Sequence, residues 1–265
     1  MLHADETPLS ILSPGEGKVA RGYLWAYASA EATGHALVWF DCQPGRSGQY
    51  ARAALDGWQG TLVVDDYAGY KALFAQSGIQ EAACWAHVRR KFFEQFTVNK
   101  GEVAQEALNR IRVLYQLERK IKHRTPENRR RWRQRYAKPA LVAFHAWLLS
   151  QHARTPAGSG IYKAIGYTLK RWPALQCYLD DGRVPIDNNR IENAIRPVAV
   201  GRKNWLFAGS LPAGQRMATL LSLLETARQN GLEPFIWLRD VLTRLPTWPN
   251  SRLRELLPYP ENTFT

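Results

Sequence analysis

The sequence predicts an α/β fold in which a mixed five-stranded sheet is interrupted by a long all-helical insertion. Up to about residue 85, strand-like and helix-like patterns alternate in the order β-β-β-α-β-α-β. From about residue 101 to residue 180, apolar residues instead recur every three or four positions, which is the spacing of helices that bury one face. Further helical patterns follow up to about residue 245.

Three strands open the chain. The first contains residues 3–7, with Asp5 on it. The segments 22–28 and 35–40 are rich in aromatic and branched residues, and the polar residues 29–34 separate them, which is the pattern of a hairpin. We therefore expect a three-stranded meander.

The second half of the predicted sheet alternates helices and strands. Residues 47–58 carry apolar residues at helical spacing, and the strand at 61–64 follows. This strand is short, apolar and followed directly by Asp65, as expected for a buried strand whose carboxyl end meets a site. A short helix at 71–76 and a fifth strand at 79–85 complete the sheet.

The polar stretch 186–197 predicts the start of a later helix. Asn189 is the expected cap, and Glu192, three residues further on, is expected to reach back to its N–H. The helix that follows ends at Asn230, and another begins at Pro234.

Composition and charge point to a polyanionic partner. The chain has 265 residues, of which 45% are hydrophobic, and a formal net charge of +13, with a pI near 9.9. No apolar run reaches the roughly 20 residues that span a membrane, and the first residues lack the basic and apolar regions of a signal peptide. We therefore expect a cytoplasmic protein that binds nucleic acid and no membrane. Cys42, Cys84 and Cys177 are too few for a disulfide framework and are expected to be reduced.

Three carboxylates fall where a shared site is expected. Asp5 lies on the first strand, Asp65 follows the fourth, and Glu192 lies on a helix after the helical block, which is the layout of a ribonuclease-H-like fold. Two divalent ions about 3.5–4 Å apart can activate the attacking oxygen and stabilise the leaving oxygen of a phosphodiester. Such ions prefer carboxylate oxygens, so the three acids predict two Mg²⁺ ions, with Mn²⁺ as a substitute. The alternative for Glu192 is a capping role alone.

A family resemblance joins these observations. It is carried by six motifs and the Trp25 strand, namely His3-Ala4-Asp5-Glu6-Thr7, Gly60 to Tyr70, Cys84-Trp85-Ala86-His87-x-Arg89-Arg90-Lys91-Phe92, Asp187-Asn188-Asn189-x-x-Glu192-x-Ala194-x-Arg196-Pro197, Gly201 to Ser210 and Leu256-Leu257-Pro258. Together they resemble the DDE-type transposases of the bacterial insertion sequence 66 family. The resemblance covers nearly the whole chain and implies cleavage of transposon ends and strand transfer to target DNA, with Asp5, Asp65 and Glu192 as catalytic and metal-binding triad.

The resemblance also implies a division of the chain. Residues 1–95 are expected to form the first part of the catalytic core, 96–182 the helical insertion, 183–245 the rest of the core and 246–265 a C-terminal tail. Family members carry upstream helical and zinc-binding segments that recognise the transposon ends. This sequence begins close to Asp5, so we expect an N-terminally truncated copy. Expected partners are DNA, further copies of the chain in a synaptic complex and accessory proteins of the same element.

Basic residues are the candidates for DNA contact. The set is Arg89, Arg90, Lys91, Arg129, Arg130, Arg131, Arg133, Arg196, Arg202 and Lys203, with His87, Asn188 and Asn189 as possible accessory residues. A solvated charged face is the alternative for the run from Lys120 to Lys138, and Trp205 and Phe207 are expected in the core. Cys84 and His87 have metal-like spacing, but without a second ligand pair nearby a buried thiol and a histidine near the site are favoured.

Three acids are alternatives to the triad. Glu6 replaces Asp5 if the register of the first strand shifts by one, and Glu225 is a weaker substitute for Glu192. Asp66 stands where the family usually has glycine, but strand alternation favours Asp65. Two other functions also stay open: a structure-specific nuclease of the same fold, and a non-catalytic DNA-binding remnant.

Overall fold

A computed structural model describes residues 1–13, 15, 17–29, 34–75 and 78–262. The strands form a five-stranded sheet in the order β3-β2-β1-β4-β5. They are β1 (Leu2–Ser13), β2 (Lys18–Ser29), β3 (Val38–Gln43), β4 (Gly60–Val64) and β5 (Ile79–Ala83). The first three are antiparallel, and β4 pairs with β5 in parallel. The prediction of a mixed, ribonuclease-H-like sheet followed by helices is confirmed.

The first hairpin is longer than predicted. β1 continues past residue 7 to Ser13, and residues 8–13 pair with residues 18–23 of β2. Pro8, Ser10 and Ser13 interrupt the apolar pattern of this segment, so the sequence gives little strand signal there. The cross-strand hydrogen bonds supply what the local pattern lacks.

The chain divides into two compact units. Unit 1 consists of Met1, Gln59–Tyr67 and Ser77–Asn189, and unit 2 consists of Leu2–Trp58, Ala68–Gln76 and Arg190–Thr265. Unit 1 therefore holds β4, β5 and the helical insertion, and unit 2 holds β1 to β3 and the last helices. In the described ranges, no helix combines the length and apolar character needed to cross a membrane.

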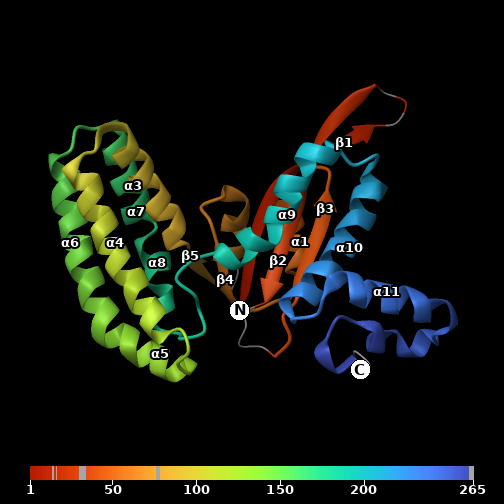
Figure 1. Ribbon diagram of the computed structural model, residues 1–265. Coiled ribbons are helices and arrows are strands. Elements are labelled where there is room, and N and C mark those ends of the chain that lie inside the picture. The colour runs from red at the N-terminus through yellow and green to blue at the C-terminus, as the bar shows by residue number, and fades with distance from the viewer. Residues whose placement is uncertain (14, 16, 30–33, 76–77, 263–265) are drawn as a thin grey trace. The chain divides into compact units, whose positions relative to one another are not determined.

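Unit 1 is a helical bundle built onto two parallel strands (Figure 1). Its helices are α3 (Trp85–Asn99), α4 (Glu102–Ile121), α5 (Pro126–Trp132), α6 (Lys138–Arg154), α7 (Gly160–Lys170) and α8 (Trp172–Gln176), with a π-helix η3 (Arg133–Ala137) and a 3₁₀ turn η4 (Cys177–Leu179). One apolar core joins Val63 of β4 and Ala82 of β5 to Trp85, Ile111 and Phe144 of the helices. The helical block predicted from residue 101 onward is confirmed.

Unit 2 packs helices on its antiparallel strands. Its elements are α1 (Gly48–Ala54), η2 (Ala68–Tyr70), α2 (Lys71–Phe74), α9 (Asn189–Trp205), α10 (Leu211–Gln229), α11 (Pro234–Arg244), η5 (Leu245–Thr247), η6 (Asn250–Leu256) and η7 (Pro260–Asn262). α10 lies along the edge strand β3, where the Thr226 and Ser222 hydroxyls accept from the N–H groups of Val38 (3.0 Å) and Phe40 (2.8 Å). These bonds satisfy donors that an open sheet edge leaves unpaired.

Helix α9 starts at Asn189, within the polar stretch that predicts a helix start. It continues through Pro197 to Trp205, although proline cannot donate the usual hydrogen bond to Asn193. Ile191, Ala194 and Val198 are buried against β1 to β3, and this packing offsets the lost bond.

Arg133 also differs from the predicted surface arginine. Its side chain is wholly buried and donates to both carboxylate oxygens of Glu118 (2.9 and 2.7 Å). The same guanidinium donates to the carbonyls of Tyr178, Asp181 and Val184 at 2.7–3.0 Å. Arg133 therefore joins α4 and η3 to the segment after η4, and we remove it from the set of predicted DNA contacts.

Replacing Arg133 by methionine is expected to lower the free energy of unfolding by about 3–5 kcal/mol, because Glu118 and three carbonyls lose their partner inside the bundle. Chemical denaturation measures the change. The matched control is Arg131→Met, since the Arg131 side chain is 71% exposed and is expected to matter by less than about 0.5 kcal/mol. Equal effects of the two changes would contradict the structural role of Arg133.

All three cysteines are free and buried. Burial, with a smaller contribution from nearby Asp41, raises the pKa of Cys42 to about 11. Burial likewise raises the pKa of Cys177 to about 11, together with Asp180 and Asp181. Because the thiolate is the reactive form, the raised pKa values make both thiols less reactive than an exposed cysteine.

Iodoacetamide at pH 8 is therefore expected to leave Cys42 and Cys177 unmodified in the folded protein and to alkylate both in guanidinium chloride, where the pKa returns to its ordinary value. Peptide mass spectrometry reads the modification at each site. Equal labelling with and without denaturant would show that the two thiols are not buried.

Candidate active site

Asp5 and Glu6 are neighbours on β1 and face opposite sides of the sheet. Side chains alternate along a strand, so Asp5 shares a face with Thr7 and Leu9, and Glu6 shares the other with Pro8. Leu9 belongs to the core that α9 and α10 cover. Asp5 therefore lies on the α9 side of the strands of unit 2.

Glu6 is held in a network on the other side. Its side chain is 1% exposed, and it accepts hydrogen bonds from the Arg46 guanidinium (2.5 and 2.8 Å) and from the Tyr70 hydroxyl (2.9 Å). Burial and the adjacent Glu6 charge raise the pKa of Tyr70, so this hydroxyl keeps its proton and stays a donor. These bonds give Glu6 a structural role and support Asp5 as the ligand on β1.

α9 runs along β1 in the same direction. Arg202 donates to the Thr7 hydroxyl (2.8 Å) and to the Pro8 carbonyl (2.7 Å), and further on Ala208 exchanges hydrogen bonds with Ser10 and Leu12. Glu192 precedes Arg202 by ten residues, or about 15 Å of helix. That length equals four to five strand residues, so we propose that Glu192 lies toward the end of β1 that carries Asp5.

Asp65 directly follows β4, at the carboxyl edge of the parallel pair. Its Oδ1 accepts from the Tyr67 N–H (2.8 Å), and its carbonyl accepts from Arg171 (3.0 Å). These contacts fix the residue, which is half-buried.

Asp66 is turned toward Arg171 instead. The Arg171 guanidinium is 3.4 Å from the Asp66 carboxylate and also forms an ion pair with Glu81. Arg171 is nearly buried, so the two acids neutralise a cation that would otherwise be costly to bury. This pairing gives Asp66 a role other than metal binding and supports the choice of Asp65.

The segment before α9 is docked onto the end of β5. The backbone N–H of Trp85 donates to the Ile186 carbonyl (3.1 Å), and the backbone N–H of Asn188 donates to the Cys84 sulfur (3.2 Å). Cys84 follows Ala83, which pairs with Val64, the residue before Asp65. Asn188 is therefore held beside the strand end that presents Asp65.

The cap of α9 differs from the prediction. The Asp187 carboxylate accepts from both the backbone N–H (3.2 Å) and the side-chain amide (2.9 Å) of Asn189. Asp187 thus supplies the acceptor at the helix start, because a carboxylate is a stronger acceptor than the Asn189 amide. Asn188 is wholly buried, and its backbone N–H makes the docking contact with Cys84 described above.

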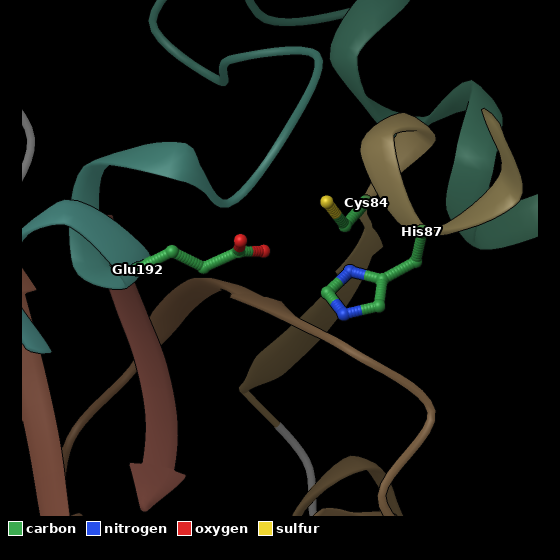
Figure 2. Close-up of side chains that lie close together, drawn as sticks. All are labelled: Cys84, His87 and Glu192. Carbon is green, nitrogen blue, oxygen red and sulfur yellow. The ribbon is translucent and has the colours of Figure 1, made fainter. Parts of the chain in front are cut away.

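Cys84 and His87 both lie where β5 is followed by α3, in unit 1. Cys84 ends the connection from β5, and His87 lies in the first turn of α3 (Figure 2). Figure 2 also shows Glu192 on the first turn of α9, which belongs to unit 2. Cys84 is buried and accepts the Asn188 bond, as the favoured interpretation of a buried thiol requires.

The basic candidates fall into two groups. Arg89, Arg90, Arg130, Arg131, Arg196 and Lys203 are exposed, whereas Lys91, Arg129 and Arg202 are half-buried. One terminal nitrogen of Arg202 donates to Thr7 and Pro8 of β1. The Lys91 Nζ lies 4.5 Å from the centre of the Tyr167 ring. All except Arg133 remain proposed DNA contacts.

Trp205 and Phe207 are not core residues, contrary to the prediction. They are 37% and 41% exposed, and Leu206 between them has a left-handed backbone with φ of 61°. This turn ends α9 and brings Ala208 to β1, so backbone pairing rather than aromatic burial anchors the segment. The apolar character of Trp205 and Phe207 alone could not reveal that both side chains are exposed.

A sheet in the order β3-β2-β1-β4-β5 followed by helices, with acids on β1, after β4 and on a later helix, has the layout of the DDE class of transposase. The chain belongs to the insertion sequence 66 family of that class. Residues 1–216 match the family described as "Transposase IS66 family", and residues 222–259 match the "IS66 C-terminal element".

Similar proteins extend this comparison. The chain is 35% identical to the uncharacterized protein y4qI and 34% identical to y4hP, both of Sinorhizobium fredii, with 97% of this chain and 50% of each relative covered. It is 58% identical over 60 residues to the uncharacterized protein YjgZ of Escherichia coli, covering 23% of this chain and 49% of that protein. The chain thus spans about half the length of the Sinorhizobium relatives it matches.

Glu6→Gln is expected to lower the free energy of unfolding by about 1.5–3 kcal/mol, since Arg46 loses its charged partner and Tyr70 its carboxylate acceptor. Asp5→Asn is the matched change on the opposite face and is expected to cost clearly less. Both are measured by urea denaturation without divalent metal. A larger loss for Asp5→Asn would reverse the assignment of the two acids.

Proposed function

We propose that this chain carries the catalytic centre of an insertion sequence 66 transposase, which cleaves transposon ends and joins them to target DNA. Asp5, Asp65 and Glu192 are the proposed catalytic residues and the ligands of two Mg²⁺ ions, with Mn²⁺ as a substitute. The proposed partners are transposon-end and target DNA, other copies of the chain in a synaptic complex, and accessory proteins of the same element.

The observation that carries the proposal is the path of residues 186–192. Residues 186–189 are docked at the β5 end in unit 1, beside the strand end that presents Asp65. Glu192 follows three residues later on the helix that covers the Asp5 face of unit 2. One short segment thus ties the Asp65 edge covalently to the element that carries Glu192.

The donor set fits hard divalent ions. All three side chains are carboxylates, and the competing acids Glu6 and Asp66 are engaged by arginine. Mg²⁺ prefers oxygen ligands and takes only a few carboxylates, since it keeps several waters. When bound, a pair of such ions supplies activation of the attacking oxygen and charge stabilisation at the leaving oxygen.

Other residues of the chain have supporting roles in this proposal. Arg202 is fixed by Thr7 and Pro8, so its remaining nitrogens are pre-oriented to hold a phosphate near β1. Exposed Arg196 and Lys203 on α9 add positive charge that binds the DNA backbone. Arg171, by pairing Asp66 and holding the Asp65 carbonyl, keeps Asp65 oriented.

The test is Mg²⁺-dependent cleavage and joining of labelled DNA ends. Asp65→Asn and Glu192→Gln are expected to lower product formation at least about 100-fold, since even groups that only support metal ligands matter by 10- to 100-fold. Asp66→Asn is the matched control, because Arg171 retains Glu81, and it should stay within a few-fold of wild type. EDTA should abolish the wild-type product.

Three results would count against the proposal. Equal product from wild type and Asp65→Asn would remove the catalytic assignment. Cleavage of branched DNA without joining would identify a nuclease of the same fold. Salt-dependent DNA binding with no product from wild type would identify a DNA-binding remnant.

A further inference from the structure

The segment from the last turn of α4 to η3 displays aromatic rings among cations. Between residues 118 and 138 the sequence holds ten Lys and Arg against two Glu, and Arg133 and Glu118 neutralise each other inside the bundle. The remaining cations lie on the last turn of α4, on the loop after it, on α5, on η3 and at the start of α6. Trp132 and Tyr136 lie among them.

The rings and two guanidinium groups form a ladder. Arg124 lies over the Trp132 ring at 4.4 Å from its centre, and the Trp132 and Tyr136 rings are 5.0 Å apart with a tilt of 40°. Arg135 lies 5.4 Å from the centre of the Tyr136 ring. Tyr136 is 46% exposed, which is high for an aromatic ring in a folded protein. We name these four residues the stacking ladder.

The support beneath the ladder is rigid. Arg133 and Ala137 form the buried side of η3, and Arg133 is fixed by five hydrogen bonds. The start of α5 packs so closely on the turn after η4 that a side chain on Gly182 would collide with the Pro126 carbonyl. A rigid base holds the half-buried Trp132 ring and the exposed Tyr136 ring in place, which lowers the entropy lost on binding.

The charges of the ladder lack acidic partners. In the described part of the chain, neither Arg124 nor Arg135 forms an ion pair. A second arginine–tryptophan contact in the insertion differs in this respect: Arg110 lies 5.2 Å from the Trp147 ring but is also paired with Glu106 at 2.8 Å. Of these two sites, only the ladder combines arginines outside any ion pair with an exposed aromatic ring, that of Tyr136.

We propose that the stacking ladder binds unpaired bases of single-stranded DNA. Every base offers a π-face to an aromatic ring, and arginine adds cation–π attraction and a contact for the neighbouring phosphate. Bases in a duplex are already stacked on each other, so the ladder selects single strands or frayed ends. This role goes beyond the proposed function, since it involves bases rather than the three acids and requires no metal.

Fluorescence anisotropy with three labelled ligands tests the proposal. They are a thymidine oligonucleotide of about 12 nucleotides, an abasic strand with the same number of phosphates, and a duplex of the same length. Wild-type protein is expected to bind the thymidine strand at least about 5-fold more tightly than the abasic strand, because stacking on one ring is worth that factor or more. Equal affinity for the two strands would overturn the proposal without any variant.

Variants then locate the preference. Trp132→Ala with Tyr136→Ala should reduce thymidine binding to the abasic level and leave abasic binding unchanged, whereas Trp132→Phe with Tyr136→Phe should keep the preference. Trp147→Ala is the matched control and should also keep it. Should the double alanine variant fold poorly in a thermal melt, Tyr136→Ala alone, at the more exposed ring, must still weaken the preference.

Two further outcomes decide the proposal. A preference that survives the loss of both rings, or a duplex bound as tightly as the thymidine strand, would overturn it. Asp65→Asn should retain the full preference, because the ladder needs no catalytic acid. Failure of catalysis and failure of base stacking are therefore distinguishable in the same set of proteins.

Discussion

Asp5 and Glu6 are adjacent in β1, so the alternation of side chains along a strand sends them to opposite faces of the sheet. On one face Glu6 is held by Arg46 and Tyr70, and these bonds fix the register and rotation of the strand. On the other face Asp5 is directed to the side covered by α9. A slip of one residue would exchange the two acids, and Arg46 and Tyr70 would then lose their carboxylate.

In each unit, contacts with arginine distinguish the acids that have a structural role from the acids proposed to bind metal. Glu6 is bound by Arg46, and Asp66 and Glu81 are bound by Arg171, whereas Asp65 is oriented by backbone hydrogen bonds. A carboxylate already bound to a guanidinium is a poor metal ligand, because the ion would have to displace a short charged hydrogen bond. The structure thus separates structural acids from proposed metal ligands by their partners.

The cations of the chain divide in a similar way. Arg133 and Arg171 are buried and organise the insertion and the β4 end, and neither is available to DNA. Arg124 and Arg135 are exposed and lie against aromatic rings. A net charge of +13 therefore overstates the charge that a nucleic acid meets, although the exposed remainder still favours a polyanion.

The sequence by itself determined the order of strands and helices, the helical insertion and the positions of Asp5, Asp65 and Glu192 within that order. Apolar periodicity and turn residues are local signals, so they could be read without coordinates. Only the tertiary structure decided that β1 extends to Ser13, that α9 passes through Pro197 and that Arg133 is buried. Each of these depends on partners distant in sequence: the cross-strand bonds of β2, the apolar face of β1 to β3, and the Glu118 carboxylate with three carbonyls. Local propensity does not favour the long β1, the helix through Pro197 or the burial of Arg133. Contacts between residues distant in sequence decide all three features.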